Sequence, residues 1–142
     1  MIGERVFLDT APFVYLIEQK DILGVKARKI FNELLYQESP LITSTITVTE
    51  YLVHPIRNNE TAHIEVFWQI IDFFNVELLD IDKHIAMEAA KIRAENVHLK
   101  GMDSLQLAAA KVAAADVFLT NDIRLKSFNE LKIVILQDGS NL

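Results

Sequence analysis

Four of the twenty acidic residues stand where carboxylates could converge on one site: Asp9, Glu50, Asp103 and Asp122. Asp9 ends an apolar run, RVFLD, and Asp122 lies two residues beyond another, VFLT. Glu50 lies in the segment after a third apolar run, and Asp103 opens an alanine-rich one. Carboxylate oxygens are the ligands that Mg²⁺ and Mn²⁺ prefer. Such a cluster could hold one or two divalent ions, which activate water and stabilise the attacking and leaving oxygens of a phosphodiester displacement.

Each acid also has an ordinary structural interpretation. Glu50 could be the second half of a capping box with Thr47, and Asp103 could be only a helix N-cap. Asp122, in the sequence TND, could bond its own backbone. Asp9 is hardest to explain this way, because a carboxylate that ends a buried strand is partly desolvated and needs a partner. The four acids together, and no single one, therefore indicate a site.

Short apolar runs predict five strands, and the segments between them predict helices. The strands are expected at residues 5–9, 41–43, 76–79, 117–120 and 132–136. The helices are expected at about 13–19, at 25–37, from Thr47 to Val53 before Pro55, from an Asn59 cap to about 74, from an Asp82 cap over 83–96, and from an Asp103 cap through the alanine run. A polar turn is expected at residues 121–128.

This alternation predicts a single α/β domain over residues 1–142, with a five-stranded, mostly parallel sheet and helices on both faces, which is a three-layer sandwich. In open parallel sheets, sites lie beyond the carboxyl ends of the strands. Asp9 and Asp122 belong at that edge by connectivity, because each closely follows a predicted strand. Glu50 is expected there from the helix that follows the second strand, and Asp103 is placed there by inference. Asp116 is interpreted as a polar residue that introduces the fourth strand.

Composition narrows the class of protein. Hydrophobic residues make up 51% of the 142, which excludes a disordered chain, and the absence of cysteine excludes disulfides, Cys-ligated zinc and thiol catalysis. No apolar run approaches the length of a membrane span and no secretory signal is visible, so we expect a cytoplasmic protein. The net charge of −6 argues against a broad basic surface for nucleic acid, but not against contact with phosphates through a bound metal.

Other kinds of site find no support in the motifs. The four histidines form no HExxH pattern, and neither GxxxxGK[ST] nor GxGxxG occurs. A haloacid-dehalogenase-like phosphatase would need an aspartate two residues after Asp9, where Ala11 stands. A receiver-type signalling domain would need a lysine after its last strand, whereas Lys132 stands at the amino end of that strand.

The chain resembles the PIN domains, and among them the VapC-like toxins, over nearly its whole length. The resemblance is carried by FLDTAPFVYLIE, TSTITVTEYL, GMDSLQLAAA and ADVFLTNDIRL. Asp9, Glu50, Asp103 and Asp122 match the acids of the family in order. The resemblance implies a metal-dependent endoribonuclease in which these four residues hold Mg²⁺ or Mn²⁺. It also implies that RNA is the substrate and that an antitoxin protein of a type II toxin–antitoxin pair occludes the site.

Small departures from the family pattern lie beside the acids. Ser104 stands where the family often has alanine, and Ala11 stands where asparagine or serine commonly follows the threonine. Four polar residues flank the acids and could orient a carboxylate or a phosphate: Thr10, Ser104, Thr120 and Asn121. The alternative to the enzyme is a PIN-like scaffold or interaction module without activity, which the complete set of four acids disfavours.

Self-association and a partner chain are expected from the apolar character of the chain. Its mean hydropathy of +0.20 is high for a small domain. The helix predicted from Asn59 is apolar around most of its circumference, with Phe67, Trp68, Ile71 and Phe74 offering a wide surface. We therefore expect a homodimer.

Overall fold

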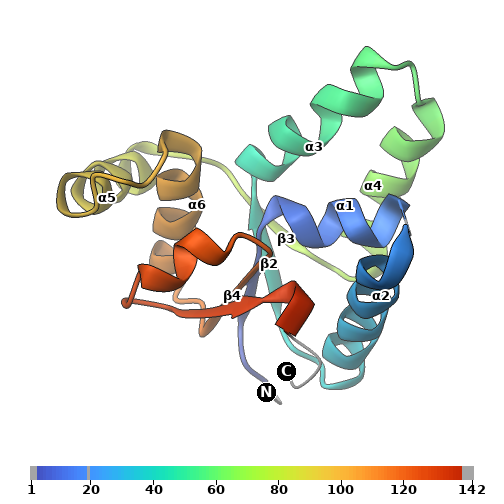
Figure 1. The fold of residues 1–142 in the computed structure, drawn as a ribbon, viewed down its shortest axis with the longest axis horizontal. Coiled ribbons are helices and arrows are strands. Elements are labelled where there is room, and N and C mark those ends of the chain that lie inside the picture. The colour runs from blue at the N-terminus through green and yellow to red at the C-terminus, as the bar shows by residue number, and fades with distance from the viewer. Residues whose placement is uncertain (1–2, 19, 139–142) are drawn as a thin grey trace.

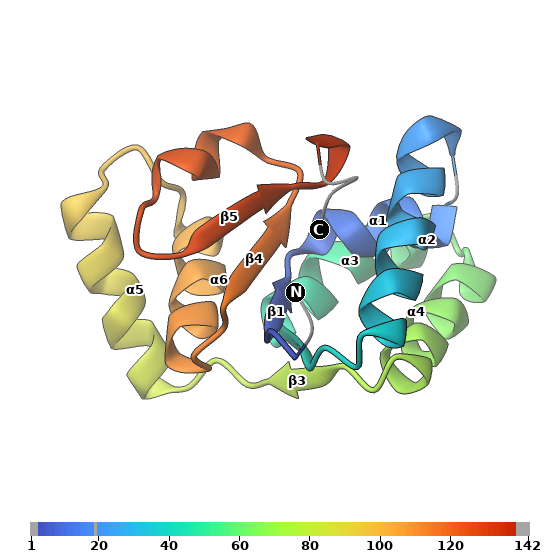
Figure 2. The same ribbon diagram turned by 90° about the horizontal axis from the view of Figure 1, so that it is seen from below.

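Five short strands form one sheet at the centre of the molecule. In the computed structural model, which describes residues 3–18 and 20–138, these are β1 (Val6–Leu8), β2 (Leu41–Ser44), β3 (Glu77–Leu79), β4 (Val117–Thr120) and β5 (Lys132–Ile135). Their order is β3-β2-β1-β4-β5 and every neighbouring pair is parallel. The predicted five-stranded α/β fold is thus confirmed, and the sheet is entirely parallel. Figure 2 shows β4 and β5 side by side and pointing the same way.

Helices cover both faces of this sheet, which gives the three layers seen in Figure 1. One face carries α1 (Thr10–Glu18), α2 (Asp21–Tyr36), α3 (Thr45–Arg57) and α4 (Thr61–Phe73). The other face carries α5 (Lys83–Glu95) and α6 (Gly101–Val112). Two short 3₁₀ helices, η1 (Ile123–Ser127) and η2 (Leu136–Asp138), follow β4 and β5. No helix in the described part of the chain has the length and apolar character needed to cross a bilayer.

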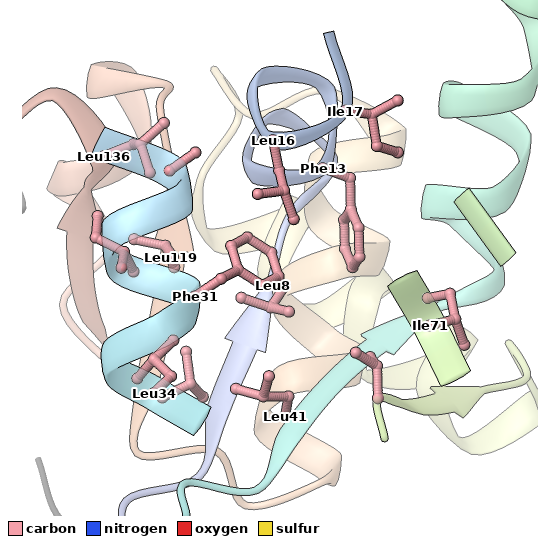
Figure 3. Packing of buried hydrophobic residues seen from close by; sticks show 14 of the residues in the cluster. Leu8, Phe13, Leu16, Ile17, Phe31, Leu34, Leu41, Ile71, Leu119 and Leu136 are labelled. Atoms are coloured by element: carbon pink, nitrogen blue, oxygen red, sulfur yellow. The ribbon is translucent and has the colours of Figure 1, made fainter. Parts of the chain in front are cut away.

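The central strands are apolar on both sides because each lies between two helical layers. Val6 and Leu8 belong to the core beneath α1 and α2, part of which Figure 3 shows. Phe7 points the other way and stacks on Phe118 of β4, with ring centroids 5.3 Å apart, in the core beneath α5 and α6. Since side chains alternate along a strand, three consecutive apolar residues supply both cores.

The start of α3 differs from the prediction. Ser44, not Thr47, is the N-cap, and its hydroxyl accepts a hydrogen bond from the Ile46 N–H at 3.1 Å. Ser44 ends β2 in an extended conformation, which is the conformation an N-cap residue needs. Thr47 is buried inside the helix, so Glu50 is not part of a capping box.

The end of α3 and the start of α4 also differ from the prediction. Pro55 does not stop α3, which continues to Arg57, because a proline near the end of a helix removes only one backbone hydrogen bond. Asn59 does not cap α4. It adopts a left-handed conformation (φ 54°) in the connection, and Glu60 occupies the N-cap position.

Helix α6 begins earlier than predicted. It starts at Gly101 with Lys100 at the N-cap position, so Asp103 lies in its first turn and is not its cap. A carboxylate there is stabilised by the positive end of the helix dipole. The predicted cap at Asp82 is confirmed, since its Oδ1 accepts from the Ile85 N–H at 2.9 Å. Helices α1 and α2 also begin three to four residues before their predicted starts.

The apolar surface predicted on α4 is smaller than the sequence suggested. Phe67 is completely buried and Ile71 nearly so, because both pack into the core beneath α1. Phe74, just past the helix, is partly buried against Phe31. Trp68 (39% exposed) and Phe73 (69% exposed) are the large apolar side chains that α4 leaves exposed to solvent.

Candidate active site

A cleft of about 490 Å³ opens at the carboxyl edge of the sheet. Strands β2 and β4 lie on opposite sides of β1, and this reversal is where open α/β sheets bind ligands. The cleft is lined by Asp9, Thr10, Ala11, Tyr15, Glu50, Asp103, Thr120, Asn121, Asp122, Ile123 and Arg124. All four acids named from the sequence therefore line one cavity, and they come from four different segments of the chain.

Asp9 is the most deeply set of the four acids. The Thr10 backbone N–H donates to its Oδ1 at 2.9 Å, and the Thr120 hydroxyl donates to its Oδ2 at 2.7 Å. Burial raises its pKa from the ordinary 3.8 to about 6, because desolvation disfavours the charged carboxylate. The negative charges of Glu50 and Asp103 raise the pKa further, while the two hydrogen bonds oppose the shift.

Glu50 and Asp103 reach the cleft from opposite layers. Glu50, on α3, accepts a 2.6 Å hydrogen bond from the hydroxyl of Thr10, the first residue of α1. Burial raises the pKa of Asp103 on α6, and the nearby charge of Asp122 raises it as well. Two carboxylates thus enter the cleft from opposite sides of the sheet, and the pKa of Asp103 responds to the negative charge beside it.

Asp122 differs because it already has a cationic partner. The Arg124 guanidinium donates from Nε to Oδ1 at 2.9 Å and from a terminal nitrogen to Oδ2 at 2.6 Å. These two side-chain hydrogen bonds and a third from the Arg124 backbone N–H hold the pKa of Asp122 below its ordinary value. The positive charge in the cleft is thus supplied by the loop that follows β4.

The donor set fits a hard divalent cation that keeps part of its water shell. Among residues 3–18 and 20–138, no three His, Asp or Glu side chains gather closely enough to hold an ion by themselves. Mg²⁺ usually binds through one or two carboxylates and several waters, so a closed protein cage is not required. Burial first, and neighbouring carboxylates second, raise the pKa values of Asp9 and Asp103, and a bound cation would favour the charged form of both.

Three of the four polar residues predicted to flank the acids line the cleft, and the fourth does not. Thr10, Thr120 and Asn121 line the cleft. Asn121 also fixes its loop, because its side chain donates to the Tyr15 hydroxyl at 3.4 Å and accepts from the Gln137 N–H at 3.2 Å. Ser104 is buried outside the lining, and its hydroxyl donates to the Lys100 carbonyl at 3.0 Å.

Asp116 and Gln106 are two polar side chains near the sheet that do not line the cleft. Asp116 lies at the amino end of β4, at the opposite edge of the sheet, where its carboxylate accepts from the Arg5 N–H at 2.7 Å. Gln106 was not predicted as a site residue. It is buried behind Asp9, and its side-chain amide donates to Oδ1 of Asp9 at 3.4 Å. Its one sequence signal is a polar residue inside an apolar run, one helical turn after Asp103.

This geometry defines a class of protein. It is an all-parallel, three-layer α/β domain with an acid-lined cleft at the carboxyl edge of its sheet. The PIN domain family matches the chain over residues 6–131, so the chain belongs to that family. No curated protein matches it.

Several solved structures share the fold over nearly the whole chain. VapBC2 from Rickettsia felis, bound to a promoter DNA fragment, has a TM-score of 0.73 at 17% identity, covering 92% of this chain and 97% of that one. DNA-bound VapBC from Salmonella typhimurium has a TM-score of 0.68 at 21% identity, with coverages of 94% and 98%. VapC20 from Mycobacterium tuberculosis, described as a sarcin-ricin loop cleaving toxin, has a TM-score of 0.63 at 14% identity, with coverages of 80% and 86%. At such identities the likeness establishes the fold.

Proposed function

We propose that this chain is a divalent-metal-dependent endoribonuclease and the toxin of a type II toxin–antitoxin pair. The observation that carries the proposal is that Asp9, Glu50, Asp103 and Asp122 line one cleft at the carboxyl edge of the sheet. Membership of the PIN domain family and the description of a structural neighbour as a sarcin-ricin loop cleaving toxin support the same activity. The proposed substrate, RNA, is found in the cytoplasm, which is therefore the proposed compartment.

The four carboxylates are the proposed catalytic residues and the ligands of Mg²⁺ or Mn²⁺. When bound, such an ion would lower the pKa of a water and neutralise charge developing on the phosphodiester. The residues of the chain itself orient the carboxylates: Thr120 holds Asp9, and Thr10 holds Glu50. Arg124 also lines the cleft, and the two guanidinium N–H groups that now donate to Asp122 can instead donate to a substrate phosphate.

Thr10, Thr120 and Asn121 are proposed to orient the substrate or the ligands around it. All three line the cleft within one or two residues of an acid. Ser104 was predicted to share this role, but its hydroxyl is engaged with the Lys100 carbonyl. We therefore expect Ser104→Ala to keep full activity.

The proposed partners are an antitoxin protein and a second copy of the chain. Besides the VapBC structures from Rickettsia felis and Salmonella typhimurium, a neighbour with a TM-score of 0.69 at 19% identity is described as a toxin–antitoxin complex from Klebsiella pneumoniae. On this chain, Val53 and Ile56 of α3 and Trp68 and Phe73 of α4 leave apolar surface exposed that a partner could cover. A basic side chain of an antitoxin could also satisfy the carboxylates in place of a metal ion.

The activity is tested with purified chain freed from any copurifying partner. A quenched fluorescent RNA oligonucleotide should be cleaved internally in Mg²⁺ or Mn²⁺, and EDTA should stop the cleavage reversibly. An inactive PIN-like scaffold would instead bind partners and leave the RNA intact under every metal condition. Addition of the recovered partner should restore inhibition.

A further inference from the structure

Gln106 is a buried polar side chain in an apolar part of α6. It is 1% exposed, and Leu107, Ala108, Ala109 and Ala110 after it are fully buried in the core. A side-chain amide in such surroundings is costly unless its donors and acceptor are all satisfied. Its partners therefore indicate why this position is not apolar.

The amide of Gln106 joins three polar groups from other elements. Its Nε2 donates to the Thr47 hydroxyl at 2.8 Å and to Oδ1 of Asp9 at 3.4 Å. Its Oε1 accepts a short hydrogen bond from the Ser44 hydroxyl. Both amide hydrogens and the carbonyl oxygen are thus engaged.

The surrounding hydroxyls fix which end of the amide faces Asp9. The oxygen of Ser44 accepts from the Ile46 N–H, so its single hydrogen is available for Oε1 of Gln106. A flipped amide would present its oxygen to the Asp9 carboxylate, and the two would repel. An N–H therefore points at Asp9.

A second chain of hydroxyls supports the same orientation. The Thr43 hydroxyl donates to the Leu8 carbonyl at 2.7 Å and lies 2.8 Å from that of Thr47. Because Thr43 has one hydrogen, Thr47 supplies the hydrogen between them and keeps its lone pairs for Gln106. The network ends on the backbone of the residue before Asp9.

This network connects the three elements that carry three of the acids. Gln106 lies three residues after Asp103 on α6, and Thr47 lies three residues before Glu50 on α3. Residues three apart lie on the same face of a helix, one turn from each other. Movement of α3 or α6 relative to β1 would therefore strain the bonds of Gln106 and change the spacing of the carboxylates together.

We propose that Gln106 is a positioning residue that holds the Asp9 carboxylate in register with α3 and α6, so that Asp9, Glu50 and Asp103 receive a divalent cation together. This inference rests on the function proposed above. Gln106 does not line the cleft and acts only through Asp9. Groups that orient metal ligands typically change metal affinity or activity by about 10- to 100-fold when removed.

The test compares Gln106→Met, which keeps the side-chain length and removes the amide, with Gln69→Met on the exposed face of α4. Mg²⁺ binding is measured by calorimetry, and RNA cleavage is measured as kcat and KM, on protein shown to be folded by circular dichroism. We expect Gln106→Met to bind Mg²⁺ about tenfold more weakly and to lose about tenfold in kcat at unchanged KM, while Gln69→Met matches the wild type. A purely structural role would lower the melting temperature alone, and that result would overturn the proposal.

Thr47→Val is the second variant, because the Thr47 hydroxyl accepts from Gln106 and makes no direct hydrogen bond to Asp9. It should change Mg²⁺ affinity and kcat in the same direction by a smaller factor. If Gln106→Met does not fold, Thr47→Val decides the question by the same measurements. If neither variant folds, the network is required for folding and the positioning role is rejected.

Asp9→Asn separates this inference from the proposed function. Loss of Mg²⁺ binding and cleavage in Asp9→Asn, with both retained in Gln106→Met, would reject the role of Gln106 and leave the nuclease intact. Full cleavage by Asp9→Asn would instead reject the proposed function.

Discussion

The hydroxyl of Thr120, the last residue of β4, donates a 2.7 Å hydrogen bond to Oδ2 of Asp9, the first residue beyond β1. The same hydroxyl oxygen accepts from the Asp122 N–H at 3.1 Å, so one side chain links two of the four acids. A hydrogen bond to a carboxylate stabilises the charged form. Thr120 therefore opposes the burial that raises the pKa of Asp9.

Replacing Thr120 by valine should raise the pKa of Asp9 above about 6, because valine keeps the shape and removes the donor. The measurement is a titration of the Asp9 carboxyl carbon by NMR in metal-free buffer. Thr49→Val, on the exposed side of α3, is the control and should leave the pKa unchanged. An unchanged or lower pKa in Thr120→Val would show that the bond does not form.

Asp9→Asn should stabilise the metal-free protein at neutral pH. The pKa of Asp9 is about 6 in the folded chain against an ordinary 3.8, so between these pH values the folded state binds more protons than the unfolded state. Wild-type stability therefore falls as pH rises through this window, by up to about 3 kcal/mol.

Urea unfolding of both proteins in EDTA over a range of pH checks this linkage. The advantage of Asp9→Asn should be largest above pH 6 and should vanish below pH 3.8, where Asp9 is protonated in both states. A difference in unfolding free energy that is constant with pH would contradict the buried, ionisable position assigned to Asp9.

Mg²⁺ or Mn²⁺ should raise the melting temperature of the wild type, because a ligand that binds only the folded state stabilises it by mass action. At a concentration about 100-fold above the Kd, the gain is about 2.7 kcal/mol. Asp103→Asn should gain less, and Glu65→Gln, on an exposed face of α4, should gain as much as the wild type. Equal metal-induced shifts in all three proteins would place the cation elsewhere.

Arg124→Gln should raise the pKa of Asp122 toward its ordinary value, because the Arg124 hydrogen bonds are the largest cause of its lowering. Removing this competing cation should also tighten Mg²⁺ binding, measured by calorimetry.

The KM of Arg124→Gln for RNA should increase, because a phosphate-binding group is lost. Lys126→Gln, in the same 3₁₀ helix, provides the matched loss of charge. Weaker Mg²⁺ binding by Arg124→Gln would refute competition between arginine and metal.

Phe73→Ser should shift the chain from dimer toward monomer in light scattering. Phe73 is 69% exposed on α4, so its removal disturbs the core little while it takes away apolar contact area. Met87→Ser, at the similarly exposed Met87 of α5, controls for loss of surface hydrophobicity and should leave the mass unchanged. A wild type that is monomeric at all concentrations would reject self-association.

The sequence predicts the parts of this fold that are decided locally. Apolar runs such as residues 5–9 form buried strands, and the parallel order follows from their alternation with helices. Asp9 and Asp122 are predicted at the carboxyl edge of the sheet because each lies within two residues of the end of a strand. Their position depends on topology and needs no knowledge of side-chain packing.

The errors arise where a distant contact decides the outcome. Thr47 and Glu50 match a capping box locally, but Ser44 takes the cap and the Thr47 hydroxyl bonds to Gln106, 59 residues away. Gln106 itself could not be identified, because Asp9 lies 97 residues from it in the chain. Phe67 likewise looks available on its own helix and is buried by other elements.

The proposed cleavage of RNA in the acid-lined cleft with a divalent cation requires the carboxylate of Asp103, so Asp103→Asn should abolish it. Asp103 lines the cleft from the first turn of α6, and asparagine keeps its size while removing the charge. In one assay, purified wild type, Asp103→Asn and Glu65→Gln are given the same fluorescent RNA over a series of Mg²⁺ concentrations. We expect Mg²⁺-dependent cleavage by wild type and Glu65→Gln, and none by a fully folded Asp103→Asn. Equal cleavage by all three proteins, or cleavage that persists in EDTA, would contradict this expectation.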